Sequence, residues 1–153
     1  MKKLRVYLDN CCFNRPYDDQ TFVSIKIETE AKIALQNKIR DNEMELCWSY
    51  ILDIENYNNP FPEREKEIGK WKQIALYDVE ENDSILLNMN KFISSGIKPL
   101  DALHISCAVE MECDYFFTVD KGILKKGTAL KDIIILSPID FILNLEKCDD
   151  DRY

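Results

Sequence analysis

Four acidic residues stand where a parallel α/β sheet would bring them to one edge: Asp9, Glu55, Asp101 and Asp120. Asp9 ends the run 4–8, and Asp120 ends the run 115–119. Both runs are short and rich in apolar or β-branched residues, which predicts buried strands. Asp9 and Asp120 are therefore expected at the carboxyl ends of two strands.

The other two acids are expected near the starts of helices. Glu55 lies in the early turns of a helix predicted over 51–57, and Asp101 lies in the first turn of a helix opened by Pro99. A helix packed antiparallel to its strand begins near that strand's carboxyl end. All four acids are thus expected to line the crevice in which open α/β sheets bind their ligands.

Taken singly, each of these acids has an ordinary structural explanation, as a turn residue or as a partner of the helix dipole. Clustered, they carry a cost, because two carboxylates about 6 Å apart repel by roughly 3 kcal/mol at an effective dielectric near 20. Bound cations would relieve that cost. Carboxylate oxygens suit Mg²⁺ or Mn²⁺, which can activate water for phosphodiester hydrolysis.

The length and composition predict one domain over 1–146, followed by a frayed acidic tail over 147–153. A chain of 153 residues buries roughly 68 to 70% of its unfolded surface, so it forms a core without metal or disulfide staples. Four glycines and five prolines argue against linkers.

Apolar periodicity and cap residues predict a mostly parallel sheet with helical crossovers. The expected elements are strands over 4–8, 46–49, 115–119 and 133–136, a polar loop over 10–20, and helices over 23–40, 51–57, 63–76, 83–94 and 99–112 and from 138 onward. The helix over 63–76 is expected to be exposed, with Ile68, Trp71 and Ala75 on one face, and is a candidate partner or lid element.

The net charge of -8 argues against broad, non-specific nucleic-acid binding. Local cations near the acids are candidate phosphate contacts: Arg15, Lys98 and Lys121. The equally good alternative is that these are solvated loop side chains.

Charged residues interrupt any signal peptide at the amino terminus, and no apolar run has membrane-spanning length. We therefore expect a cytoplasmic protein without membrane association, whose six cysteines are reduced and mostly buried. The single histidine, His104, lies one turn beyond Asp101. It is either a general acid or base, or a partly buried residue held by a local hydrogen bond, which we favour.

Taken together, the segments 7–10, 99–105 and 113–121 and the helix carrying Glu55 resemble those of PIN-domain nucleases. The resemblance covers nearly the whole chain. It implies a three-layer α/β/α fold with a mostly parallel central sheet. It also implies Mg²⁺- or Mn²⁺-dependent endonucleolytic cleavage of RNA, and many such proteins are VapC-type toxins paired with an antitoxin.

By this resemblance the catalytic, metal-binding acids are Asp9, Glu55, Asp101 and Asp120. Asn10 and Thr118 are the neighbouring polar groups, which would orient water or carboxylates. Glu55 is assigned by order and spacing, so Glu43 and Glu45 stay open as alternatives.

Two positions depart from the family's pattern. Many PIN sequences carry a further acid just after the last aspartate, where this chain has Gly122, so a second metal site is expected to be weak or missing. The segment 10–16 also differs from the small hydroxyl-bearing turn that commonly follows the first aspartate. Substrate contacts are therefore expected to differ.

The leading hypothesis is a metal-dependent endoribonuclease, the toxin of a toxin–antitoxin pair, with RNA as substrate and an antitoxin as partner. The alternative is a catalytically weak interaction or regulatory domain, which would pair with itself as a homodimer or with another protein through Ile68 and Trp71. A metal-dependent phosphatase on a related sheet is a third hypothesis.

Overall fold

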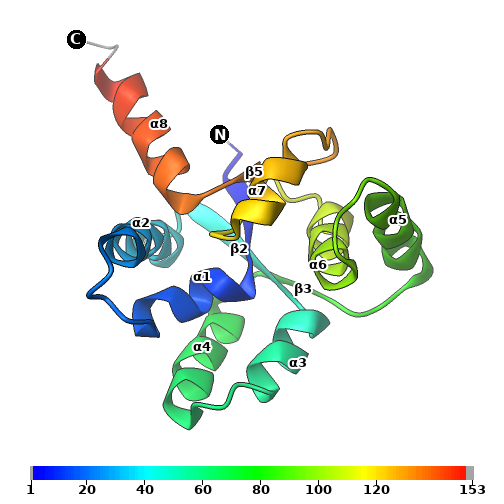
Figure 1. The fold of residues 1–153 in the computed structure, drawn as a ribbon, viewed down its shortest axis with the longest axis horizontal. Helices are drawn as coiled ribbons and strands as arrows, with labels where there is room; N and C mark the ends of the chain where they lie inside the picture. Colours follow the sequence, from blue (N-terminus) through cyan, green and yellow to red (C-terminus); the bar gives the residue numbers. More distant parts are fainter. Residues whose placement is uncertain (1, 151–153) are drawn as a thin grey trace.

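A five-stranded sheet forms the centre of the molecule, in the order β3-β2-β1-β4-β5 (Figure 1). The computed structural model describes residues 2–150, and every pair of neighbouring strands in its sheet is parallel. The strands are β1 (Leu4–Leu8), β2 (Met44–Ser49), β3 (Tyr77–Val79), β4 (Tyr115–Phe117) and β5 (Ile134–Leu136). The predicted parallel sheet is confirmed.

Helices cover both faces of this sheet, which gives the predicted three-layer α/β/α architecture. They are α1 (Asn10–Asn14), α2 (Val23–Arg40), α3 (Tyr50–Tyr57), α4 (Pro62–Ile74), α5 (Asp83–Ser94), α6 (Pro99–Glu110), α7 (Lys121–Gly127) and α8 (Pro138–Asp150), with a 3-10 turn at Arg15–Tyr17. Figure 1 shows α2 and α8 on one side of the strands and α5 and α6 on the other, with α3 and α4 beside α1.

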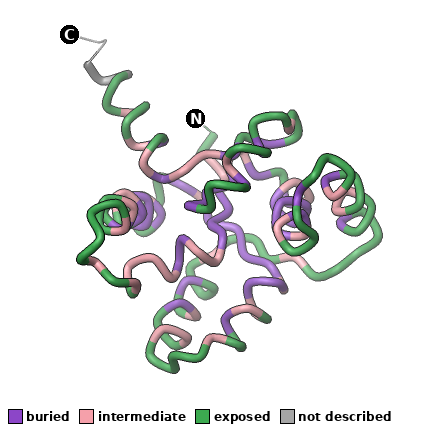
Figure 2. Tube along the Cα trace, in the orientation of Figure 1, coloured by how far each residue is buried: buried purple, intermediate pink, exposed green. Residues whose placement is uncertain are grey.

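The core is centred on β1 and its neighbour β4. Tyr7 and Leu8 of β1 and Phe116 and Phe117 of β4 are fully buried, and Figure 2 shows the central strands as the most buried part of the chain. Tyr7 pairs with Phe116 in the sheet register, and their rings stack 5.4 Å apart. Each such side chain contributes roughly 1.5 to 3 kcal/mol by leaving water.

The sequence prediction missed four elements. The segment 10–20 is not a plain loop, because it contains α1 and a 3-10 turn with Pro16 near its start. The edge strand β3 and the helix α7 were also not predicted. All four are short, so they lack the repeated apolar spacing on which the prediction relied.

The prediction that the helix over 63–76 is exposed along its apolar face is wrong. Ile68 and Trp71 of α4 are only 2% and 6% exposed. Trp71 packs under the guanidinium of Arg40, which lies 4.6 Å from a ring centroid. Helix α4 therefore turns its apolar face toward the chain's own core and leaves its charged face in solvent, where Glu67 pairs with Lys70 at 2.8 Å.

Smaller differences concern the element ends. Helix α4 ends at Ile74 and α6 at Glu110. The N-cap of α5 is Asn82, whose side chain accepts from the Ile85 N–H. Helix α8 continues through Asp150, and the remainder of the tail predicted to be frayed lies outside the described residues. Within residues 2–150 no helix is both long enough and apolar enough to cross a membrane.

The close packing of α7 on β5 leads to a stability prediction. A Cβ added at Gly127 would lie 2.7 Å from Ile135 Cδ1 and 3.0 Å from Ile135 Cβ. Gly127→Ala is therefore expected to destabilise the protein by about 1 to 3 kcal/mol through overpacking, measured by urea unfolding. The control is Gly69→Ala in α4, where the nearest atom would be 3.7 Å away. Equal stability of both variants would contradict this packing.

Candidate active site

Two of the four predicted acids follow neighbouring strands at the carboxyl edge of the sheet. Asp9 directly follows β1, and its N–H donates to the carbonyl of Phe117 at 2.9 Å, which continues the pairing of β1 with β4. Asp120 lies three positions beyond the end of β4. Each acid also begins a helix: Asp9 accepts from the Asn10 N–H at 2.7 Å, and Asp120 accepts from the Ile123 N–H at 3.0 Å.

The other two acids reach the same place from helices. Glu55 lies in α3, which Ser49 caps, and Asp101 lies in the first turn of α6. All four acids line a single open pocket of about 340 Å³. Its lining residues are Asp9, Asn10, Cys11, Asn14, Arg15, Asp18, Glu55, Asp101 and Asp120. The fold thus gathers acids that are spread over most of the sequence.

Thr118 connects Asp9 with Asp120. It is fully buried, and its hydroxyl donates to Asp9 Oδ2 at 3.0 Å while accepting from the Asp120 N–H at 3.1 Å. The Cys11 thiol also donates to Asp9 Oδ2, at 3.4 Å. One hydroxyl therefore fixes the spacing between the two acids that follow the strands.

Replacing Thr118 by valine keeps the side-chain shape and removes both of these hydrogen bonds. Asp9 Oδ2, on a buried carboxylate, then loses this donor and the Asp120 N–H loses its acceptor, so we expect a loss of about 1 to 3 kcal/mol in the free energy of unfolding. Urea titration measures this loss. The matched control is Thr128→Val, because the exposed hydroxyl of Thr128 bonds only to the Lys125 carbonyl at 3.0 Å. A Thr118→Val variant as stable as that control would contradict the bridging role.

His104 lies behind the pocket and is 1% exposed. Its Nε2 is hydrogen-bonded to Glu55 Oε1, and its Nδ1 lies 2.6 Å from the hydroxyl of Tyr7. That hydroxyl lies 2.7 Å from Ser49 Oγ, which caps α3. The imidazole is therefore a hydrogen-bonded link that holds Glu55 to the sheet. The sequence favoured a partly buried residue held by a local hydrogen bond, whereas His104 is buried and both of its partners are distant in the chain.

The charges of the cluster influence each other. Burial, followed by the negative charges of Asp9 and Asp120, raises the pKa of Asp101. Burial lowers the pKa of His104, but the hydrogen bond to Glu55 and the charge of Asp9 outweigh it, so the net pKa of His104 is raised. The folded protein thus disfavours the charged form of Asp101, so added positive charge in the pocket would be stabilising.

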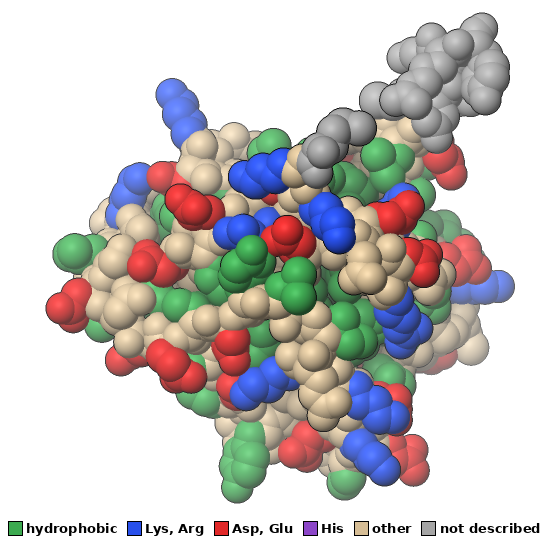
Figure 3. Space-filling model, turned by 180° about the vertical axis from the view of Figure 1, so that it is seen from behind, with side chains coloured by type: hydrophobic (Ala, Val, Ile, Leu, Met, Phe, Trp, Pro, Cys, Tyr) green, Lys and Arg blue, Asp and Glu red, His purple; other side chains and the backbone are tan. Residues whose placement is uncertain are grey.

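Two of the three predicted phosphate contacts lie at the acids. Arg15 lines the pocket and pairs with Asp18 at 3.0 Å and, on its other side, with Glu28 at 3.8 Å. Lys98 lines a small adjoining hollow of about 40 Å³ with Asp101 and Asp120. Lys121 is exposed in the first turn of α7. On the face seen from behind the view of Figure 1, basic and acidic side chains are interspersed (Figure 3).

The two alternative acids lie elsewhere. Glu45 is engaged by Arg5 across β1 and β2, at 3.4 Å. Glu43 pairs with Lys38 at 3.6 Å, after the end of α2. Neither lines the pocket that holds the other acids. Of the three candidate glutamates, Glu55 is the one that the fold brings to Asp9, Asp101 and Asp120.

The donor chemistry of this pocket fits a hard divalent cation, because four carboxylates face one open space. These carboxylates are spaced more widely than the ligands of a formed metal site. Among the side chains that the structure describes, residues 2–147, no three His, Cys, Asp or Glu groups are close enough to hold an ion as they stand. Binding would have to draw the carboxylates together. At Gly122 an added Cβ would come within 3.1 Å of Asp120 Oδ1, so a side chain here would crowd that carboxylate.

Sequence reasoning missed several residues of the site: Tyr7, Cys11, Asn14, Asp18 and Ser49. Asn14 follows Asn10 by one helical turn, and its amide donates to the Asn10 carbonyl at 3.1 Å. That i, i+4 spacing was a usable signal, but it lies in a helix of five residues. Tyr7 gave no signal, since it resembles one more apolar position of a buried strand.

The sheet order, the flanking helices and the acidic carboxyl edge together define a fold of the PIN-domain type. Solved structures agree. The chain matches FitAcB from Neisseria gonorrhoeae with a TM-score of 0.58 and 13% identity, over 87% of this chain and 97% of that one. It matches VapBC2 from Rickettsia felis, bound to a promoter DNA fragment, with a TM-score of 0.56 and 13% identity, over 88% and 98%.

A third match is VapBC-1 from nontypeable Haemophilus influenzae, with a TM-score of 0.58 and 15% identity, over 88% of this chain and 98% of that one. No family model matches the sequence, and no curated protein is significantly similar to it. At these identities the comparisons establish the fold, a three-layer α/β/α fold of the PIN-domain type.

Proposed function

We propose that this protein is a metal-dependent endoribonuclease that hydrolyses RNA phosphodiester bonds at the carboxylate pocket. The observation that carries the proposal is the convergence of Asp9, Glu55, Asp101 and Asp120 on one pocket at the carboxyl edge of a PIN-type sheet. The pKa of Asp101, raised by burial and then by the charges of Asp9 and Asp120, supports it, because an added cation would offset both effects.

The side chains of the pocket have different proposed roles. Asp9, Glu55, Asp101 and Asp120 would hold Mg²⁺ or Mn²⁺, and such an ion supplies Lewis-acid stabilisation of the developing charge and activation of water. Thr118 keeps Asp9 in place through its 3.0 Å hydrogen bond. Asn10 presents its amide on the pocket wall, beside Asp9.

Cations at the rim complete the proposed site. Arg15 on the pocket wall and Lys98 in the adjoining hollow would receive the phosphate that flanks the cleaved bond. Lys121, which is exposed on α7, would contact a phosphate further along the strand.

Incubation of purified protein with single-stranded and structured RNA in the presence of Mn²⁺ tests the proposal. Wild type is expected to cut RNA internally, and Asp101→Asn is expected to cut it far more slowly. Absence of cleavage, or equal cleavage by both proteins, would refute the assignment. Turnover of phosphomonoesters by the same preparation, without RNA cleavage, would instead indicate a phosphatase.

The fold neighbours extend the proposal to a biological role. They include VapBC2 and VapBC-1, which share this chain's fold at 13% and 15% identity. We propose that this chain is likewise the toxin of a toxin–antitoxin pair and binds an antitoxin. Induced expression in a bacterial host is then expected to stop growth, and Asp101→Asn is expected to abolish the effect. Growth that is unaffected by wild type would contradict the toxin role.

The alternative of a catalytically weak interaction domain loses the surface on which it was based. Ile68 and Trp71 are buried inside the chain and cannot meet a partner without unfolding α4. A homodimer and a cytoplasmic location stay predictions from the sequence. The ribonuclease proposal is the one that uses the pocket that the fold builds.

A further inference from the structure

A second groove adjoins the carboxylate pocket, and most of its polar lining is uncharged. Its volume is about 430 Å³, within the roughly 300 to 1,000 Å³ typical of ligand pockets. The polar and aromatic lining includes Asn10, Asn14, Asn58, Asn59, Phe61 and Arg64. The groove shares Asn10, Asn14 and Glu55 with the carboxylate pocket, so the two are continuous.

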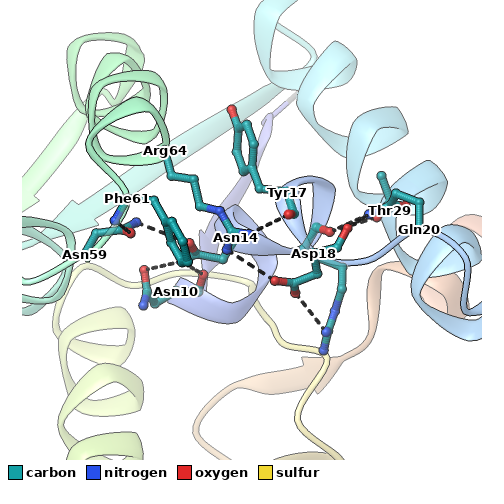
Figure 4. Close-up of polar contacts among 10 residues, drawn as sticks. Asn10, Asn14, Tyr17, Asp18, Gln20, Thr29, Asn59, Phe61 and Arg64 are labelled. Atoms are coloured by element: carbon teal, nitrogen blue, oxygen red, sulfur yellow. Dashed lines mark hydrogen bonds and ion pairs between the residues drawn. The ribbon is translucent and has the colours of Figure 1, made fainter.

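Phe61 forms an aromatic platform in this groove. The side chain is 52% exposed, and the Arg64 guanidinium lies 4.3 Å from the ring centroid. Arg64 is itself held in place, because it donates to Asp18 Oδ1 at 3.3 Å and to the Tyr17 carbonyl at 2.5 Å (Figure 4). The ring is therefore backed by a fixed cation and open to solvent elsewhere.

A chain of side-chain amides connects this platform to the carboxylate pocket (Figure 4). Asn14 Nδ2 donates to Asn10 Oδ1 at 3.2 Å, and Asn59 Nδ2 donates to Asn14 Oδ1 at 3.3 Å. Asn59 Oδ1 in turn accepts from the Phe61 N–H at 3.0 Å. Each amide carries two N–H donors and two lone pairs, so these contacts fix the side chains without using all of their hydrogen-bonding capacity.

We infer that this groove seats one unpaired nucleobase of the RNA substrate, stacked on Phe61 and hydrogen-bonded by Asn10 and Asn14. The inference rests on the proposed ribonuclease function and makes these residues determinants of its sequence preference. Stacking on aromatic rings and contacts from amides are the means by which proteins read single-stranded RNA. Because the groove shares a wall with the carboxylate pocket, the seated base would be adjacent to the cleaved phosphodiester.

The overall charge supports a base contact rather than a backbone contact. With a net charge of -8, the chain does not carry the excess of basic side chains that drives non-specific binding to phosphates. Base stacking does not depend on such an excess. The exposed side chains of Ile54 and Leu100 also line the groove and would suit a peptide. The amides and the arginine-backed ring beside a carboxylate pocket favour the nucleotide.

The test compares Phe61→Leu, which keeps an apolar side chain and removes the stacking surface, with wild type on a single-stranded RNA. The same RNA is also prepared with one abasic nucleotide at each position around the cleaved bond. For wild type, one abasic position is expected to lower kcat/KM about tenfold, the effect of losing one stacked base. Phe61→Leu is expected to show that loss on intact RNA and no further loss at that abasic position.

Two variants serve as controls. Phe61→Trp is expected to keep the wild-type rate, because it retains an aromatic platform. Tyr57→Leu removes an aromatic side chain that is 80% exposed and lies outside the groove, and it is expected to behave as wild type. If Phe61→Leu cuts intact RNA at the wild-type rate, or loses activity equally at every abasic position, the base subsite is refuted.

Failure of the base subsite can be distinguished from failure of the proposed ribonuclease function. If wild type cuts no RNA, the ribonuclease proposal fails. Fluorescence anisotropy of a labelled single-stranded hexanucleotide then tests whether the groove binds a base. Binding about tenfold weaker in Phe61→Leu than in Tyr57→Leu would support the base subsite on its own. Equal binding, or none, would refute it. A loss of binding to a peptide partner in Phe61→Leu, with unchanged RNA binding, would refute it in favour of a protein ligand.

Discussion

Asp101→Asn is expected to reduce Mn²⁺-dependent RNA cleavage roughly a hundredfold or more, because several kcal/mol of charge stabilisation depend on the cation that this carboxylate would help to hold. The same change is expected to stabilise the cation-free protein. The neutral amide that replaces the carboxylate would avoid both the cost of burial and the repulsion by Asp9 and Asp120, which together raise the pKa of Asp101. After allowance for solvent screening, the gain is about 0.5 to 1 kcal/mol.

Thermal unfolding with and without Mn²⁺ measures the second effect. For a domain of this size the gain corresponds to about 1 to 4 °C in Tm. Mn²⁺ should raise the Tm of wild type, since it binds the folded state, and should raise that of Asp101→Asn much less. Asp132→Asn is the matched control, because Asp132 pairs with Lys91 at 3.2 Å outside the pocket. A lower Tm for metal-free Asp101→Asn than for wild type would contradict the charge cluster.

Lys32→Met is expected to stabilise the protein by about 2 kcal/mol at pH 6. Lys32 is 2% exposed in α2, and its ammonium group lies 5.5 Å from the Phe13 ring centroid and 5.7 Å from a Trp71 ring centroid. Burial lowers the pKa of Lys32 from 10.5 to about 7. That lowering corresponds to roughly 5 kcal/mol, of which the contacts with the two rings recover a part.

The sign of the pH dependence follows from proton binding. Between pH 7 and 10.5 the unfolded chain keeps the proton of Lys32 and the folded chain has released it, so wild-type stability rises with pH over this range. The advantage of Lys32→Met is therefore largest below pH 7 and shrinks toward pH 10. Urea unfolding at pH 6, 8 and 10 measures it. Lys38→Met on the same helix, where the lysine is partly exposed and pairs with Glu43 at 3.6 Å, is the control. A gain that stayed constant with pH would contradict the buried charge.

The long and regular parts of the fold were predictable. Strand β1 and helix α2 have the predicted bounds, because a five-residue run that is apolar except for Arg5 and an amphipathic pattern of 18 residues each allow one interpretation. Strand β3 has three residues with two of them exposed, so no burial pattern marks it. Periodicity showed that Ile68 and Trp71 share a face, but it carries no information about whether that face meets solvent or the core.

The candidate site was predictable where the order of elements alone places a residue. Strand ends and helix starts bring the four acids to one edge, and the structure has them lining one pocket. The support behind Glu55 was not predictable. Tyr7 bonds to residues 42 and 97 positions away, Ser49 and His104, and only the packed fold brings such distant residues together. The groove at Phe61 was not predictable from the sequence for the same reason, since Asn14 and Asn59 are 45 positions apart.

The acids that begin helices have a consequence for how a protein of this kind loses its activity. Asp9 and Asp120 each cap the helix that follows them, so the fold retains them whether or not RNA is cut. Asp101 makes no such capping hydrogen bond, and its charged form is unfavourable in the folded protein. Once selection for cleavage is relaxed, mutation is expected to remove Asp101 early and to spare the two capping residues. Inactive descendants would therefore still carry half of the acidic set.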